Sequence, residues 1–182
     1  GQAGGQAVAE VLFGDYNPAG KLPLTFYRNL AQIPDFEDYN MTGRTYRYMK
    51  ETPLFPFGHG LSYTTFKYGK LKMNDDKIAA GQNLNLVIPV TNTGSRDGDE
   101  VVQVYLKKMD DTEGPVKTLR AFKRVRIPAG KTVEVKFSLD DTQLEWWDEQ
   151  SNTMRVCPGN YTVMIGGTSC EKSLLSRAFT IR

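Results

Sequence analysis

The chain has 182 residues, of which about a quarter are charged, and its formal net charge is +2. This length allows one or two domains with a hydrophobic core that needs no disulfide or metal for support. The nearly balanced charge argues against nucleic acid as a partner. No apolar run approaches the roughly 20 residues of a membrane-spanning helix, so we expect no membrane insertion.

Residues 1–26 predict one short helix and one extended segment. Apolar residues recur at helical spacing from Gly5 to Phe13, and Gly14 is placed to end the helix in a left-handed cap. After a turn rich in Asp, Asn, Pro and Gly, Leu22 to Phe26 is expected to be extended. One helix and one strand cannot bury their apolar faces alone. Because the chain opens directly in this pattern, we expect it to be part of a larger protein.

Residues 27–65 are rich in tyrosine and phenylalanine, contain Pro34, Pro53 and Pro56, and show no sustained period. Aromatic residues are scarce in disordered segments and supply large apolar contacts when a segment is ordered. We therefore predict an ordered but irregular linker whose rings anchor it to neighbouring surfaces.

Residues 66–182 alternate between apolar and polar positions, as half-buried strands do. The alternating apolar residues form four sets: Leu84, Leu86, Ile88 and Val90; Val102, Val104 and Leu106; Val133, Val135, Phe137 and Leu139; Tyr161, Val163 and Ile165. Turn signals separate them at Asn92 to Gly94, Pro128 to Gly130 and Pro158-Gly159. This pattern predicts an antiparallel β-sandwich of about seven strands, of the immunoglobulin-like, fibronectin III type, because the Cys…Trp…Cys spacing of immunoglobulin domains is missing.

Six motifs follow one another and cover nearly the whole chain: GQAGGQAVAEVLFGDYNPAGKLPLTF, GRTYRY, PLFPFGHGLSYTTF, VTNTGSRDGDEVVQVYL, LRAFKRVRIPAGKTVEVKFSL and PGNYTVMIGG. Together they resemble the C-terminal end of glycoside hydrolase family 3 enzymes, the β-glucosidases and β-xylosidases. The resemblance implies that residues 1–26 are the last helix and strand of an α/β-sandwich domain, that residues 27–65 are the linker, and that residues 66–182 are a fibronectin III-like domain.

The same resemblance implies a parent enzyme that removes terminal β-linked sugars with retention, without a cofactor, and that is secreted or periplasmic. Its catalytic aspartate would lie on an N-terminal barrel and its acid/base glutamate on the α/β-sandwich domain. Those domains and a β-linked oligosaccharide are the expected partners, and this chain, which lacks both motifs, is expected to be inactive by itself. The stretch GRTYRYMKETPLFPFGHGLSY is most similar to the β-xylosidase branch.

Four residues are candidates for substrate binding. Trp146 and Trp147 have rings that can stack on sugars, but neighbouring strand residues point to opposite faces, so we expect one ring in the core and at most one exposed. Arg44 and Tyr46 belong to types that bind sugars and also line interfaces. Strand-like alternation would place Arg44, Tyr46 and Tyr48 on one side of the segment and Thr45 and Arg47 on the other. We interpret Arg44 and Tyr46 as interface anchors. The open alternatives are a carbohydrate-binding module and an adhesion domain.

The remaining titratable residues favour structural roles. His59 is the only histidine and has no nucleophile elbow near it, so we expect it to be packed in the linker, and no metal-ligand spacing is present. The acidic residues, among them Asp97, Asp99 and Glu100, lie in or beside predicted turns and are expected to be solvated. Cys157 and Cys170 bracket a predicted strand about 23 Å long, which argues against a disulfide between them.

Overall fold

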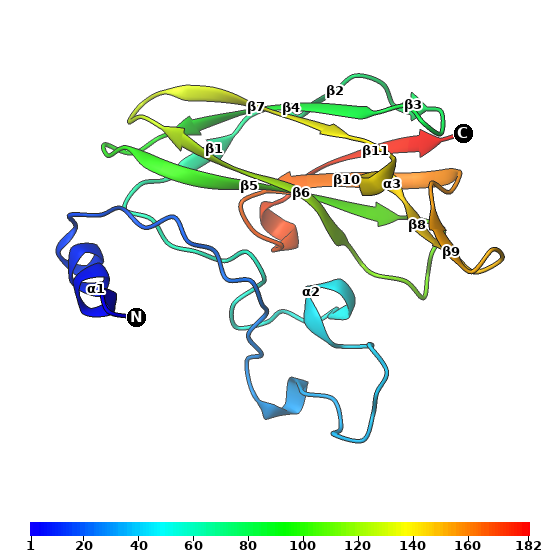
Figure 1. Ribbon diagram of the computed structural model, residues 1–182, viewed down its shortest axis with the longest axis horizontal. Coiled ribbons are helices and arrows are strands. Elements are labelled where there is room, and N and C mark those ends of the chain that lie inside the picture. Colours follow the sequence, from blue (N-terminus) through cyan, green and yellow to red (C-terminus); the bar gives the residue numbers. More distant parts are fainter.

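The computed structural model describes residues 1–182 and divides them into a β-sandwich and an irregular N-terminal part that runs along the outside of one sheet (Figure 1). The N-terminal part holds α1 (Gly4–Phe13), the 3-10 turn η1 (Leu30–Gln32) and α2 (Thr45–Tyr48). As predicted, α1 ends at Gly14, whose φ of 83° is left-handed and whose N–H donates to the Val11 carbonyl.

Two sheets make up the sandwich. The first contains β1 (Phe66–Tyr68), β2 (Lys72–Met73), β4 (Leu84–Asn92) and β7 (Thr132–Leu139), with β4 paired to the other three. The second has the order β3 (Lys77–Ile78), β11 (Leu175–Ile181), β10 (Gly159–Gly166), β5 (Gly98–Lys108) and β6 (Thr118–Ile127). All pairs are antiparallel except β3 with β11. A separate hairpin joins β8 (Trp146–Asp148) to β9 (Thr153–Arg155). Short turns are α3 (Asp141–Leu144) and η2 (Glu171–Ser173).

The core lies between the sheets and is built from the predicted alternation. Of the alternating residues of β4, β5, β7 and β10, all but the half-buried Val133 are buried. Burying one such aliphatic side chain contributes about 1.5–3 kcal/mol, so these strands supply most of the hydrophobic stabilisation of the chain. The predicted β-sandwich is confirmed, and its two sheets hold nine strands, several of only two or three residues, in place of about seven.

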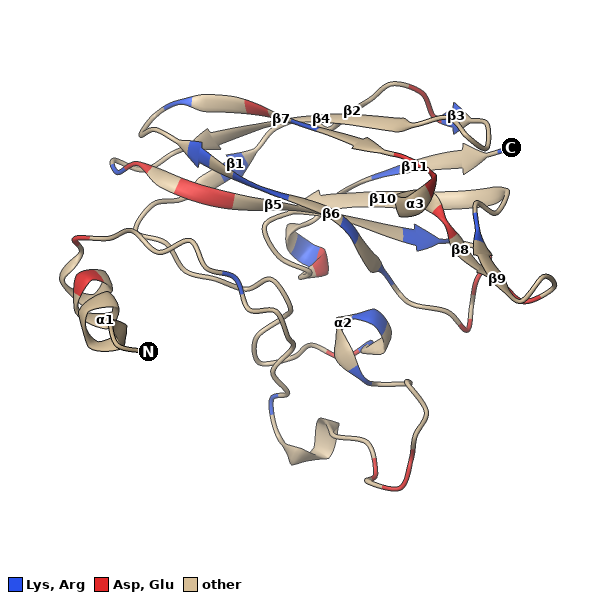
Figure 2. Cartoon of the chain, viewed as in Figure 1, with Lys and Arg blue, Asp and Glu red and all other residues tan.

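The longest strands that the alternation did not reveal are β6 and β11. In β6 only the two end residues, Thr118 and Ile127, are buried, and in β11 only Phe179 and Ile181. Basic residues of β6 lie beside the acidic start of β5, where Arg124 pairs with Asp99 (Figure 2). A strand that presents so few apolar residues to the core gives no clear period of two in the sequence.

Two local predictions need correction. Residues 44–48 do not alternate as a strand: α2 is a helical turn, and Thr45 has a left-handed φ of 56°. The segment Leu22 to Phe26, predicted to be extended, forms no strand: it bends at Pro23 and Leu24, and Phe26 makes a single bridge with Phe55 of the linker. Both cysteines are free, as predicted. None of the helices combines the length and hydropathy that crossing a bilayer requires.

Candidate functional site at the domain joint

The joint between the N-terminal part and the sandwich begins with a pairing of two motif segments, residues 22–26 and 54–59. Four backbone hydrogen bonds of 2.8–2.9 Å connect them: Leu22 N to His59 O, Gly58 N to Leu22 O, Phe26 N to Phe55 O and Leu54 N to Phe26 O. Leu22 and Phe26 therefore satisfy their backbone groups inside this chain. The side chain of His59 stacks on Phe55 with ring centroids 5.0 Å apart, which favours a packing role.

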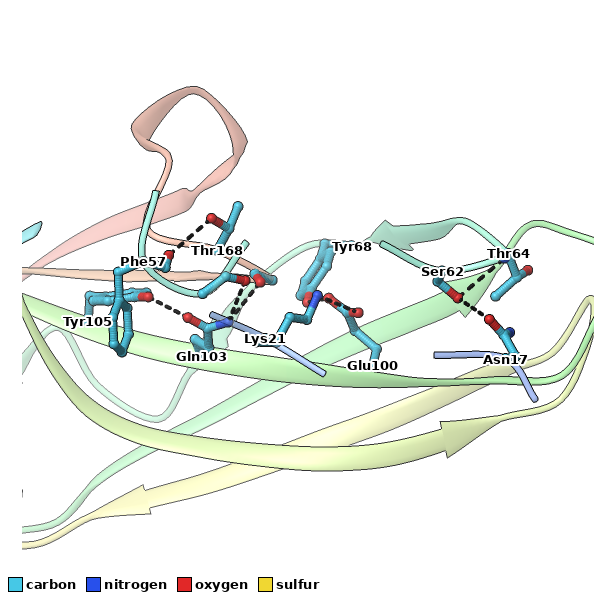
Figure 3. Close-up of polar contacts among 12 residues, drawn as sticks. Asn17, Lys21, Phe57, Ser62, Thr64, Tyr68, Glu100, Gln103, Tyr105 and Thr168 are labelled. Atoms are coloured by element: carbon cyan, nitrogen blue, oxygen red, sulfur yellow. Dashed lines mark hydrogen bonds and ion pairs between the residues drawn. The ribbon is translucent and has the colours of Figure 1, made fainter. Parts of the chain in front are cut away.

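The outer face of β5 receives this paired segment. Val104 faces the core, so the alternating residues Gln103 and Tyr105 point outward, and the linker buries both (Figure 3). The Gln103 amide donates to the carbonyl of Gly167 at 2.7 Å and, at 3.5 Å, to that of Gly58, and its oxygen accepts from the Tyr105 hydroxyl. The pKa of Tyr105 is raised by burial.

Gly58 fits this joint because it has no side chain. Its φ of 78° lies in the left-handed region, and a Cβ there would come within 2.2 Å of the Gln103 amide oxygen. The neighbouring Phe57 carbonyl accepts hydrogen bonds from Ser169 N at 2.9 Å and Thr168 Oγ1 at 3.2 Å. The linker backbone therefore also contacts the loop that follows β10.

An ion pair crosses the joint beside this contact. Lys21 Nζ lies 3.2 Å from Glu100 Oε2, and the Tyr68 hydroxyl donates to Glu100 Oε1 at 2.8 Å (Figure 3). Burial, and then the charge of Glu100, raises the pKa of Tyr68. Glu100 was expected in a solvated turn, but it lies in β5 and its side chain is 7% exposed. The turn signal of Asp97-Gly98 ends before it, and partners from two distant segments make its burial possible.

A third set of polar contacts fixes the end of the linker. Asn17 accepts from Ser62 Oγ and Tyr63 N at 2.9 and 2.8 Å, and its amide donates to the Asp97 carbonyl. Thr64 donates to Asn92, which is fully buried and whose amide donates to the carbonyls of Arg96 and Ile127. Asn92 appeared in the sequence only as a turn residue, and its contact with Thr64 depends on residues 28 positions apart meeting in space.

The candidate residues Arg44 and Tyr46 have different surroundings. Tyr46 stacks on Phe57 at 4.3 Å, and its hydroxyl accepts from Leu119 N at 3.1 Å, so it belongs to the joint. Arg44 donates to three backbone carbonyls of the exposed loop 35–40 and holds that loop together. Although α2 is helical, Arg44, Tyr46 and Tyr48 are the half-buried residues of this stretch.

The tryptophan pair divides between core and surface. Trp146 is 4% exposed, packs edge-on against Tyr161 and donates to Asp111 Oδ2 at 2.7 Å, whereas Trp147 is 49% exposed. Trp147 lines a groove of about 610 Å³ at the end of the sandwich, together with Tyr48, Asp111, Arg120 and other polar residues. Arg44 and Tyr46 do not line this groove, so the four candidates do not form one site.

The acidic residues with resolved pKa shifts lie in or directly beside turns. The pKa values of Asp38, Asp140 and Asp148 are lowered, chiefly because donors close by in the sequence bind the carboxylates, and the pKa of Asp97 is lowered chiefly by the backbone N–H of Ala129. Asp140 caps α3 in a capping box with Gln143. These carboxylates act in local structure, and the geometry of the joint is that of a connection between segments.

Two family models match the chain on either side of this joint. The first, described as the glycosyl hydrolase family 3 C-terminal domain, matches residues 1–63, and the second, a fibronectin type III-like domain, matches residues 100–169. A xylan 1,4-β-xylosidase from Xylanibacter ruminicola is 51% identical over the whole chain. The chain corresponds to the C-terminal part of glycoside hydrolase family 3 proteins. A β-xylosidase from Formosa agariphila and a periplasmic β-glucosidase from Salmonella typhimurium are 40% and 38% identical over 100% and 94% of the chain.

Solved β-glucosidase structures share the same fold over nearly all of the chain. β-Glucosidase 3B from Thermotoga neapolitana, in complex with α-D-glucose, has a TM-score of 0.84 and 33% identity, covering 99% of this chain and 27% of its own. A β-glucosidase from Erythrobacter marinus has a TM-score of 0.82 and 37% identity over 98% of this chain and 24% of its own. The chain spans 21–26% of the three curated family 3 relatives named above.

Proposed function

We propose that this chain is the C-terminal, non-catalytic part of a retaining exo-acting β-glycosidase that degrades carbohydrate without a cofactor. Its family, and the names β-xylosidase and β-glucosidase among its relatives, support this activity for the whole protein. The 51% identity to a xylan 1,4-β-xylosidase favours terminal β-xylosyl units over β-glucosyl units as substrate. The name of the periplasmic relative supports a secreted or periplasmic location.

The role we propose for the chain itself is to brace the catalytic domains of the same protein, an N-terminal barrel and an α/β-sandwich domain. The observation that carries this role is the exposed apolar surface of residues 1–65, which hold fifteen of the twenty exposed large apolar side chains, Phe13, Leu24, Phe26 and Phe36 among them. The helix α1 has no buried residue and a single charged one, Glu10 (Figure 2). Exposed apolar surface of this extent marks an interaction site.

An activity assay tests whether this chain is non-catalytic, as proposed. The 182-residue chain, incubated with nitrophenyl β-xyloside or β-glucoside, is expected to release no nitrophenol, because the two carboxyls of a retaining glycosidase lie on the other domains. Release above a trace rate would contradict the non-catalytic role. The coding sequence upstream of Gly1 is expected to encode a barrel with a catalytic aspartate, and a sequence without one would contradict the proposed enzyme class.

A second candidate function, carbohydrate binding by the sandwich, is favoured by the groove at Trp147. A half-exposed ring beside polar groups suits a sugar, which presents an apolar face and hydroxyls. Titration of xylo-oligosaccharides while tryptophan fluorescence is recorded tests this function. A saturable change that is lost in Trp147→Ala supports binding, and the bracing role alone expects no saturable change.

A further inference from the structure

A second cavity, of about 390 Å³, lies between the linker and the loop that leads into η2. Its N-terminal side includes Thr25 and the linker residues Tyr46 and Pro53, and its sandwich side includes Lys117, Ser169 and Cys170. The groove of Trp147 shares none of these residues. A volume of several hundred Å³ is in the range of sites that hold small molecules.

Lys117 is the first unexplained residue of this cavity. The residue is buried, with 8% exposure, and its ammonium group forms no ion pair and no hydrogen bond within the chain. Lysine is almost never buried without a partner, because removing the charge from water is costly. This burial lowers the pKa of Lys117, and the charge of Glu171 opposes that effect.

Thr25 is the second unexplained residue of this cavity. Its hydroxyl oxygen is buried and has no hydrogen-bond partner, although the backbone N–H and carbonyl of the next residue, Phe26, are both paired with the linker. Unsatisfied buried hydroxyls are uncommon in folded proteins. Lys117 and Thr25 come from distant segments and both line this cavity, and each carries a donor that has no partner within the chain.

The charges around the cavity indicate which ligand matches these donors. Arg28, Lys50 and Lys172 line it with Lys117, against only Glu51 and Glu171, so its lining has a net positive charge. A neutral sugar gains little from a buried ammonium, whereas the net positive lining attracts an anion. A carboxylate carries one negative charge and accepts hydrogen bonds on two oxygens.

We propose that this cavity binds a carboxylate group, with Lys117 Nζ and Thr25 Oγ1 donating to its oxygens. The volume admits a ligand of monosaccharide size, such as a sugar acid, and the same chemistry is available from an aspartate or glutamate side chain presented by protein. The inference is independent of the bracing role, because it rests on residues that do not belong to the exposed apolar surface.

Calorimetric titration of the 182-residue chain with glucuronate, acetate and glucose tests the proposal. Saturable heat is expected with both carboxylates and not with glucose. A glucuronate affinity at least tenfold higher than that of acetate identifies a sugar-acid site, whereas equal affinities identify a site for the carboxylate alone, as a protein side chain presents it. The absence of saturable heat with either carboxylate overturns the proposal.

Three variants locate the binding. Lys117→Met keeps the side-chain length and removes the charge, and glucuronate is expected to bind at least tenfold more weakly, the effect of losing one charge-assisted hydrogen bond. Thr25→Val keeps the shape and is expected to weaken binding several-fold. The exposed Lys136 is the control, and Lys136→Met is expected to bind as the unchanged chain does.

Folding of the main variant can be checked in the same experiment. Lys117→Met is expected to melt at the same or a higher temperature without ligand, because it replaces a buried, unpaired charge by an apolar group. If this variant folds and still binds glucuronate as tightly as the unchanged chain, the cavity is not the binding site and the proposal is wrong.

Discussion

Both parts of the chain, residues 1–65 and residues 66–182, contain many apolar side chains, but they differ in how many of these they bury. The sandwich buries its apolar residues in one core between two sheets, whereas the N-terminal part contributes only three of the 34 buried residues of the chain. Phe13 and Phe36 are 85% and 92% exposed, while the core residues of β4 are 0% exposed. The sandwich therefore stabilises itself, and the N-terminal part is held by polar contacts and by a few rings at the joint.

The core and the joint also differ in how strictly they require particular side chains. In the core, any apolar side chain of similar volume can replace another at modest cost. At the joint, Gln103, Glu100 and Asn92 each require particular partners from another segment, because a buried polar group without a partner is destabilising. This contrast is consistent with the bracing role, since a brace must hold its outer segments in a fixed position.

The largest expected difference in stability is between a variant in the core of the sandwich and a variant in the exposed N-terminal loop. Leu86→Ala in β4 is expected to lower the free energy of unfolding by about 2–5 kcal/mol through lost burial and a cavity, whereas Phe36→Ser is expected to change it by less than about 0.5 kcal/mol. Urea denaturation followed by circular dichroism measures both. A loss above about 1 kcal/mol for Phe36→Ser would show that the loop is packed within this chain.

The next effect concerns the buried charge of the joint. Glu100→Gln leaves Lys21 without its anion and is expected to cost about 1–3 kcal/mol, less than a fully buried pair because Lys21 retains some contact with water. Glu134 is the control: its pair with Lys72 is exposed, and Glu134→Gln is expected to cost at most about 0.5 kcal/mol. Equal losses in thermal denaturation for the two variants would contradict a structural role for the crossing ion pair.

Gly58 at the joint and Gly81 in the sandwich form a matched pair, because both have left-handed φ values. Alanine at either position is expected to cost about 1 kcal/mol for the backbone conformation. Gly81 has open space around its Cβ position, whereas Gly58 meets Gln103, so Gly58→Ala is expected to lose about 1–3 kcal/mol more. If both variants unfold at the same urea concentration, the joint does not contribute to the stability of the folded chain.

The smallest effect belongs to the edge of the sandwich and depends on pH. The pKa of Asp140 is lowered from 3.8 by hydrogen bonds from Thr142, so its contribution is present above pH 3.8 and is lost as the pH falls through the lower, folded-state pKa. Asp140→Asn keeps a capping side chain without this titration. Its melting temperature is expected to match the unchanged chain at pH 7 and to fall less steeply below pH 4. Parallel melting curves at all pH values would rule out this contribution.

Several features of the site could be predicted from sequence and others could not. The helix with its Gly14 cap and the two faces of Trp146 and Trp147 follow from local periodicity, and the structure places one ring inside and one outside. The burial of Glu100 and the roles of Asn92 and Gln103 left no signal, because their partners are up to 79 residues away. The boundaries at residues 26 and 65 stay a proposal, since the matching family model runs through residues 1–63.

The sequence by itself determined the sandwich, the motif-based family and the irregular character of the linker, because periodicity and turn chemistry act between near neighbours. Only the tertiary structure decided that GKLPLTF pairs with PLFPFGHG and not with a sheet, that β5 is buried on both faces, and that Lys117 and Thr25 line one cavity. These features depend on which distant segments meet, and a hydrogen-bond donor in the sequence carries no mark of whether its acceptor lies within the same chain.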